Sequence, residues 1–201
     1  MNLSFSYVVS LLFVVSAVLG TTIVASTTTS NNQAWADVIE GTEGPDVIVG
    51  TPEDDLIDSK GGDDINNGDT DVGQGSGDDI IVSEEGDDLN RGDTRFGDGF
   101  EDDIIVSEEG DDRNLGDTTI GEGSGDDIIV SGEGNDENFG DADPKFGGTG
   151  SGDDIIVSGE DDDTNTGNGG RDIFVCGGGE DTVTDFNEDE GDIATPDCQN
   201  V

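Results

Sequence analysis

The stretch GSGDDIIVSEEGDDLNRGD, from Gly75 to Asp93, decides the fold of this chain. It contains two short units of one kind, each a turn rich in glycine and aspartate followed by three residues suited to a strand. Aliphatic residues are enriched in strands, whereas glycine and aspartate are enriched in turns. The stretch therefore predicts two short strands joined by tight turns, and most of the chain repeats it.

The repeat has a fixed period. Its Asp-Asp-aliphatic runs start at Asp54, Asp78, Asp102, Asp126 and Asp153, at spacings of 24, 24, 24 and 27 residues. Each spacing is two nonamers plus an insert, which has six residues in the 24-residue units and nine in the 27-residue unit. Internal periods of this length are typical of solenoids and other repeat folds.

The nonamers, such as GTEGPDVIV from Gly41 and QGSGDDIIV from Gln74, resemble the G-G-x-G-x-D-x-U-x repeat of the RTX (haemolysin-type) calcium-binding family. The resemblance covers roughly Gly41 to Asp192. It implies an all-β, right-handed parallel β-roll, or β-solenoid, in which six residues of each nonamer turn and bind metal and three form a strand. The chain departs from the pattern in three ways: the first position is often not glycine, inserts lengthen alternate turns, and one row of strand positions carries asparagine.

The composition excludes an ordinary globular domain. The chain has 51 acidic and 6 basic residues, a net charge of −45, and 29% hydrophobic residues. Such a chain repels itself, so it is either a disordered polyanion or a fold completed by divalent cations. The periodic strands favour the second alternative. Nucleic acid is excluded as a partner because phosphate binding needs a basic patch.

Each nonamer supplies an aspartate at its sixth place, behind glycines that allow the backbone to turn. Calcium takes six to eight oxygen ligands from carboxylates and carbonyls, so these aspartates are candidate Ca²⁺ ligands. The alternative, a merely solvated acidic surface, fits the fixed spacing poorly. The candidates are Asp46, Asp55, Asp64, Asp79, Asp88, Asp103, Asp112, Asp127, Asp136, Asp154, Asp163, Asp172 and Asp181.

The resemblance further implies that one calcium ion is shared between successive coils on the same edge of the roll. The aspartates of one edge would be Asp79, Asp103, Asp127 and Asp154. Those of the other edge would be Asp64, Asp88, Asp112, Asp136 and Asp163.

Two rows of strand residues are expected to face inward. The first is an aliphatic ladder of Ile57, Ile81, Ile105, Ile129 and Ile156. The opposite row is Asn66, Asn90, Asn114, Asn138 and Asn165. We expect an internal asparagine ladder, in which each amide bonds to its neighbour in the next coil. The alternative is that the inserts re-phase this row and turn it outward.

Strand alternation places two further apolar rows together on the outer face of the same strands. They are Ile80, Ile104, Ile128 and Ile155, with Val82, Val106, Val130 and Val157; we call them the Ile/Val face. A continuous apolar stripe indicates a cover or a partner. The cover would come from the apolar insert residues Val72, Phe96, Ile120 and Phe146. Self-association or a cell-surface partner is the equal alternative.

The ends of the chain have their own patterns. Tyr7 to Leu19 is almost wholly apolar, and Ala34-Trp35-Ala36 fits a cleavage site, so residues 1–36 are predicted to be a signal peptide. An uncleaved anchor is the alternative. Residues 37–175 are then the roll and residues 176–201 a cap and tail. The predicted location is extracellular, either secreted or associated with the cell surface.

The segment from Arg171 is similar to the closing segment of RTX repeat blocks, and Phe174, Val183 and Phe186 are expected to fill the last coil. Asp172, Asp181 and Asp185 would hold the final ions. The only two cysteines, Cys176 and Cys198, predict a disulfide in a secreted chain, with two free thiols as the alternative.

No enzymatic chemistry is indicated. The chain lacks histidine, which excludes Ser-His-Asp and Cys-His sites, and no acidic pair is singled out for acid–base work. The sequence therefore predicts a secreted calcium-binding roll, not an enzyme, whose folding is driven by Ca²⁺. The alternatives are a cell-surface structural or adhesion protein that binds mineral, ice or a surface layer, and a disordered acidic polymer that buffers cations.

Overall fold

The structure, a computed structural model, describes residues 37–70, 72–74 and 76–199. These residues belong to one compact unit, Trp35–Val201. The predicted signal peptide and its cleavage motif, residues 1–36, lie outside the described residues.

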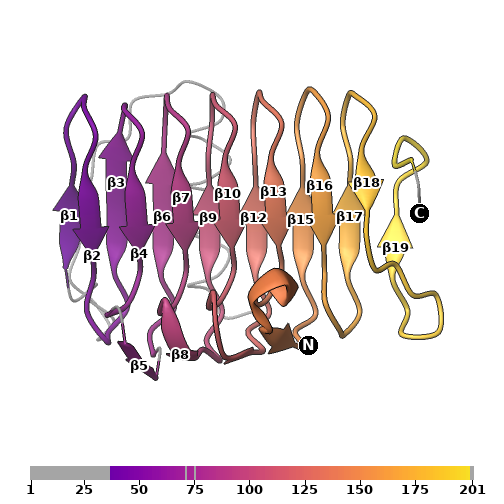
Figure 1. Cartoon of the computed structure of the whole chain (residues 1–201), viewed down its shortest axis with the longest axis horizontal. Coiled ribbons are helices and arrows are strands. Elements are labelled where there is room, and N and C mark those ends of the chain that lie inside the picture. Colours follow the sequence, from indigo (N-terminus) through magenta and orange to yellow (C-terminus); the bar gives the residue numbers. More distant parts are fainter. Residues whose placement is uncertain (1–36, 71, 75, 200–201) are drawn as a thin grey trace, which may run out of the picture. The chain divides into compact units, whose positions relative to one another are not determined.

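The described residues form a solenoid of short parallel strands, which confirms the predicted all-β fold (Figure 1). One sheet has eight strands: β1 (Val38–Glu40), β3 (Leu56–Lys60), β6 (Ile80–Ser83), β9 (Ile104–Val106), β12 (Ile128–Val130), β15 (Ile155–Val157), β17 (Ile173–Val175) and β19 (Ile193–Ala194). The facing sheet has seven: β2 (Val47–Val49), β4 (Ile65–Asn67), β7 (Leu89–Arg91), β10 (Arg113–Leu115), β13 (Glu137–Phe139), β16 (Thr164–Thr166) and β18 (Thr182–Val183). Each coil contributes one strand to each sheet.

The inserts form a third stack beside the two sheets. Their strands are β5 (Val72–Gln74), β8 (Phe96–Asp98), β11 (Glu122–Gly123) and β14 (Thr149–Gly150), and the longest insert adds the 3₁₀ helix η1 (Pro144–Phe146). β5 pairs with β8 and β11 with β14, in parallel, and isolated bridges join β8 to the next insert. The inserts therefore stack from coil to coil as the main strands do.

The inserts also distinguish the two edges of the roll. We call the turns that lead into the eight-stranded sheet the insert edge, since four of them contain inserts (for example Gly68 to Asp79). The turns that lead into the seven-stranded sheet are shorter (for example Ser83 to Asp88), and we call them the short-turn edge.

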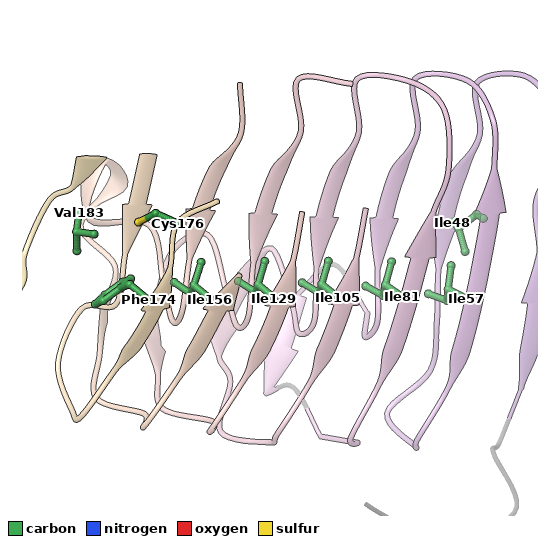
Figure 2. Close-up of a cluster of buried hydrophobic side chains, with 9 residues drawn as sticks. All are labelled: Ile48, Ile57, Ile81, Ile105, Ile129, Ile156, Phe174, Cys176 and Val183. Atoms are coloured by element: carbon green, nitrogen blue, oxygen red, sulfur yellow. The ribbon is translucent and has the colours of Figure 1, made fainter. Parts of the chain in front are cut away.

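The predicted isoleucine ladder is confirmed. Ile57, Ile81, Ile105, Ile129 and Ile156 stand in register on adjacent strands, and each is fully buried (Figure 2). Parallel strands lie about 4.8 Å apart, so identical side chains at one repeat position pack directly on each other. Phe174 continues the row at the C-terminal end, in register with Ile156.

The asparagine ladder is also confirmed, and the alternative of an outward-facing row is wrong. Each Asn Nδ2 donates to the Asn Oδ1 of the next coil at 2.9 to 3.1 Å, from Asn66 through to Asn165, and all five side chains are buried. Each Nδ2 also donates to a buried serine hydroxyl seven residues earlier. These serines are Ser59, Ser83, Ser107, Ser131 and Ser158. Both amide hydrogens are thus bonded, which makes an amide row tolerable in an otherwise apolar interior.

The apolar insert residues do not cover the Ile/Val face, as one alternative expected. Phe96, Ile120 and Phe146 line a pocket together with Leu89 and Arg113 of the seven-stranded sheet. The inserts therefore lie against the outer face of that sheet. Self-association through the Ile/Val face remains a prediction.

Side chains on the outer face of the seven-stranded sheet show the same contact. Arg91 donates to Thr119 Oγ1 of an insert at 2.7 Å, and Lys145 of η1 lies over the ring of Phe139, which is 2% exposed. Leu115 is fully buried on this face. An outward-pointing leucine and phenylalanine are therefore part of a second, smaller apolar layer beneath the inserts.

The C-terminal end is closed as expected. Cys176 and Cys198 form a disulfide, with their Cα atoms 5.1 Å apart. Val183 is buried beside Asn165 of the preceding coil, and Phe186 packs against the same core. β18 and β19, which lie within the predicted cap, extend both sheets by one strand.

The asparagine ladder predicts a specific sensitivity to substitution. Asn114→Ala removes the donor to Asn138 Oδ1 and Ser107 Oγ and the acceptor for Asn90 Nδ2. Because each unsatisfied buried polar group costs about 1–3 kcal/mol, we expect the free energy of unfolding to fall by about that much or more. Urea denaturation in millimolar calcium measures it.

The matched control is Asn135→Ala, since Asn135 is exposed on the same coil as Asn138. Its substitution should change the unfolding midpoint little. Equal midpoints for the two variants would contradict a stabilising role of the ladder.

Candidate metal-binding edges

Both edges of the roll carry a row of aspartates, and the thirteen candidate ligands all lie in these rows. All are buried except Asp46, which is half-buried. The insert-edge row is Asp55, Asp79, Asp103, Asp127, Asp154 and Asp172. The short-turn row is Asp46, Asp64, Asp88, Asp112, Asp136, Asp163 and Asp181. The structure thus places on the two edges the aspartates that the repeat assigned to each.

One carboxylate oxygen of each aspartate accepts a hydrogen bond from the neighbouring coil. The backbone N–H of Asp79 donates to Oδ1 of Asp103 at 2.7 Å, and that of Asp88 donates to Oδ1 of Asp112 at 2.9 Å. The same bond recurs along both rows at 2.6 to 3.0 Å. These bonds hold each carboxylate in one orientation.

The second carboxylate oxygen has no donor in most members of the two rows. Buried Oδ2 atoms without a hydrogen-bond partner occur on Asp64, Asp79, Asp88, Asp103, Asp112, Asp127, Asp136, Asp154, Asp163 and Asp181. A buried acceptor left unsatisfied costs about 1–3 kcal/mol, and more when it is charged. These oxygens have no hydrogen-bond donor, are held in one orientation and recur at a regular spacing. Calcium is a hard cation that binds carboxylate oxygens, so the residues present fit a row of calcium ions.

Backbone carbonyls are available beside these oxygens because successive turns stack closely. Gly110 has φ of 144°, and a Cβ on it would lie 1.9 Å from the carbonyl oxygen of Gly86 in the preceding coil. Glycine is therefore required there both by the left-handed backbone and by the close approach. Among the residues that the structure describes, no three acidic side chains lie close enough together to hold a metal ion. A cation would accordingly combine one or two carboxylates with carbonyl oxygens.

Burial changes the acidity of these aspartates in the absence of a cation. On the short-turn edge it raises the pKa of Asp88 to about 6 and the pKa values of Asp112 and Asp163 to about 7. On the insert edge it raises the pKa of Asp79 to about 9 and that of Asp154 to about 10, with neighbouring carboxylates adding to the effect. The metal-free fold therefore favours the protonated acids.

A third row of aspartates lies in the inserts, and the sequence analysis missed it. It consists of Asp69, Asp93, Asp117 and Asp141, all fully buried. Burial raises the pKa of Asp69 to about 8 and that of Asp117 to about 12, and nearby aspartates of the insert-edge row and of this third row contribute. The signal was present, since each insert begins with Gly-Asp at the same spacing, but the inserts had been treated as spacers.

The comparisons with known proteins identify the repeat. The family model of the RTX calcium-binding nonapeptide repeat matches four copies, over residues 36–65, 75–89, 123–142 and 148–183, which together make half of the chain. Comparison with curated proteins and with solved structures gave no significant match.

Proteins with this repeat are typically secreted, and their roles are typically structural or binding rather than catalytic. Among the residues that the structure describes, no helix is long and apolar enough to cross a membrane. The periodic aspartate turns, the parallel solenoid and the family match agree: this chain belongs to the RTX calcium-binding nonapeptide repeat family.

Proposed function

We propose that this chain is a secreted, non-enzymatic calcium-binding roll whose folding is driven by calcium ions held between successive coils. The observation that carries the proposal is the set of ten buried Oδ2 atoms without a donor in the two aspartate rows. Bound calcium supplies the positive charge and the coordination that these oxygens lack. The proposal includes residues 1–36 as a signal peptide, 37–175 as the roll and 176–201 as the cap.

The charges explain why folding would depend on the ion. At neutral pH the chain has a net charge of −45, and the fold buries rows of acids one coil apart. Since bound cations stabilise only the folded state, their binding free energy contributes directly to folding. Extracellular calcium modules bind at about 10⁻⁴–10⁻³ M, so the chain would stay unfolded at the low calcium concentration inside a cell.

The Ile/Val face supports a second proposal, self-association or attachment to a cell-surface partner. Ile155 on this face is 36% exposed, and Ile193 in the last strand of the same sheet is 56% exposed. Exposed aliphatic side chains grouped on a surface are typical of sites that bind a partner. The exposed part of this face lies toward the C-terminal end of the sheet, since Ile80, Ile104 and Val106 are buried.

Calcium titration followed by far-UV circular dichroism tests the main proposal. We expect a cooperative increase in strand signal with calcium but not with magnesium, because magnesium demands small octahedral sites and gives up its water reluctantly. Asp112→Asn keeps the Oδ1 acceptor for Asp88 N–H but removes the charge at the orphaned oxygen. The midpoint of the calcium titration should shift to a calcium concentration about tenfold higher, which corresponds to a loss of about 1.4 kcal/mol of binding free energy.

The matched control is Asp111→Asn, which makes the same charge change one residue away at an exposed side chain. Its midpoint should stay close to that of the unaltered chain. If the two substitutions shift the midpoint equally, overall charge and not a ligand is responsible. A spectrum that stays flat in millimolar calcium would leave only the disordered acidic polymer.

The raised pKa values predict the pH dependence of the metal-free chain. The pKa values of Asp88, Asp112 and Asp163 rise from 3.8 when unfolded to about 6 or 7 in the fold, so the folded state binds more protons between these values. Their contribution to stability is full below pH ~4 and is lost as the pH rises through ~6–7. With a chelator present, strand signal should therefore increase as the pH is lowered from 7 to 4.

Saturating calcium is the control for this experiment, since bound cations take the place of the protons and should keep the roll folded at pH 7. A metal-free strand signal that grows as the pH rises would contradict the assignment of buried acids to the folded state.

A further inference from the structure

We propose that the inserts build a second set of cation sites, distinct from those of the repeat turns. In it, the insert aspartates of successive coils hold divalent cations between them. The row is Asp69, Asp93, Asp117 and Asp141, one residue from each insert. The proposal rests on the calcium-binding roll proposed above only in assuming that the coils stack as the structure shows.

A comparison between coils of this chain gives the first reason. Two turns into the eight-stranded sheet have no insert, and a neutral residue, Thr51 or Asn168, follows their first glycine. Thr51 donates to Asp55 Oδ2 from its N–H at 2.5 Å and its hydroxyl at 3.0 Å. In the four coils with inserts, an aspartate follows that glycine. The edge aspartates of these four coils all have an orphaned Oδ2. At the place where Thr51 donates its hydroxyl to the edge aspartate, the insert coils have an aspartate that can only accept when ionised. A cation would supply the positive partner that both carboxylates then lack.

The carboxylates of neighbouring inserts converge at one point. A Cβ on Gly99 would lie 1.9 Å from Asp93 Oδ2 and 2.9 Å from Asp117 Oδ1. Neither oxygen has a hydrogen-bond donor. Both oxygens therefore lie against Gly99, whose lack of a side chain lets two unpartnered carboxylates from successive coils come close to each other.

A carboxylate of the insert-edge row lies beside the residue that precedes Asp93. A Cβ on Gly92, the residue before Asp93, would lie 2.0 Å from Asp103 Oδ2, which is buried and has no donor. Asp93 is itself fully buried, and neither of its two oxygens has a donor. Asp103 Oδ2 and both oxygens of Asp93 thus lie beside two consecutive residues of one turn and lack a donor. The other three aspartates of the insert row each accept one backbone N–H and keep one unsatisfied oxygen.

The chemistry points to a hard divalent cation. Carboxylate pairs supplemented by carbonyl or water oxygens suit calcium, which accepts irregular shells of six to eight ligands. Such an ion would tie the insert strands β8 and β11 of successive coils together, beside the edge of the main sheets where Figure 1 shows β8. The insert stack would then be held by the same kind of interaction as the roll.

The test counts bound calcium ions. The full chain, the double variant Asp93→Asn/Asp117→Asn and the control Asp87→Asn/Asp111→Asn are dialysed against one millimolar-range free calcium concentration. Bound calcium per chain is then measured by elemental analysis, and far-UV circular dichroism is recorded on the same samples. The control removes two charges from exposed side chains in the same two coils.

We expect the insert variant to keep its calcium-induced strand signal and to lose about one to three bound ions relative to the unaltered chain, while the control loses none. The range corresponds to the junctions between inserts that involve the two aspartates. Equal numbers of ions in all three proteins would overturn the proposal and leave shared protons as the partner of these acids.

A second variant covers the case in which the double variant does not fold. Asp93→Thr introduces the residue that Thr51 shows to be compatible with this turn, and its hydroxyl can donate to Asp103 Oδ2. It should fold and still bind fewer ions; undiminished binding would overturn the proposal. If the unaltered chain shows no calcium-induced strand signal, the proposed function fails instead, and the difference in bound ions still decides the insert sites.

Discussion

Stacking of identical acids one coil apart is the constraint on which the rest of this structure depends. A parallel solenoid repeats every side chain at about the strand spacing, so an aspartate that suits one turn meets its own copy in the next. The backbone N–H of each aspartate donates to one carboxylate oxygen of the aspartate in the following coil. This bond occupies that oxygen and fixes the position of the second oxygen of the same carboxylate. The remaining oxygens are buried, alike in charge and without donors, and this is the reason for proposing that cations complete the fold at neutral pH.

In the interior, identical neutral side chains also stack one coil apart. Isoleucine at one position gives an apolar column, and asparagine at the opposite position gives a hydrogen-bonded column, because both repeat without slippage. The serine seven residues before each asparagine takes the second amide hydrogen. The amide column ends against Ile48 at one end and Val183 at the other, where the repeat itself ends. A polar row is tolerated inside this roll since each of its members supplies the partner of the next.

The inserts make the two edges of the roll different. On the short-turn edge the turns are minimal, and glycines let consecutive backbones approach closely. On the insert edge the added residues fold back over the seven-stranded sheet, where Leu115 and Phe139 are buried and Arg91 is bonded to Thr119. The same inserts bring a second row of buried acids beside the first. Lengthening a turn has therefore added both an apolar layer and a set of charges to one side of the molecule.

The sequence by itself determined whatever depends only on period and position within the repeat. The two main sheets, the inward isoleucines, the stacking of the asparagines and the division of the aspartates between two edges follow from the spacing, because residues at equal repeat positions must stack. The inward direction of the asparagine row was an expectation that the buried amide hydrogen bonds decided. The tertiary structure decided what depends on contacts between different positions. The side to which the inserts fold, the serine partners of the asparagines and the close approach of Asp103 to Gly92 are set by packing between segments that the period does not relate. The pairing of Cys176 with Cys198 was predicted from the location of the two residues, but the closeness of their Cα atoms is a result of how the tail returns to the last coil.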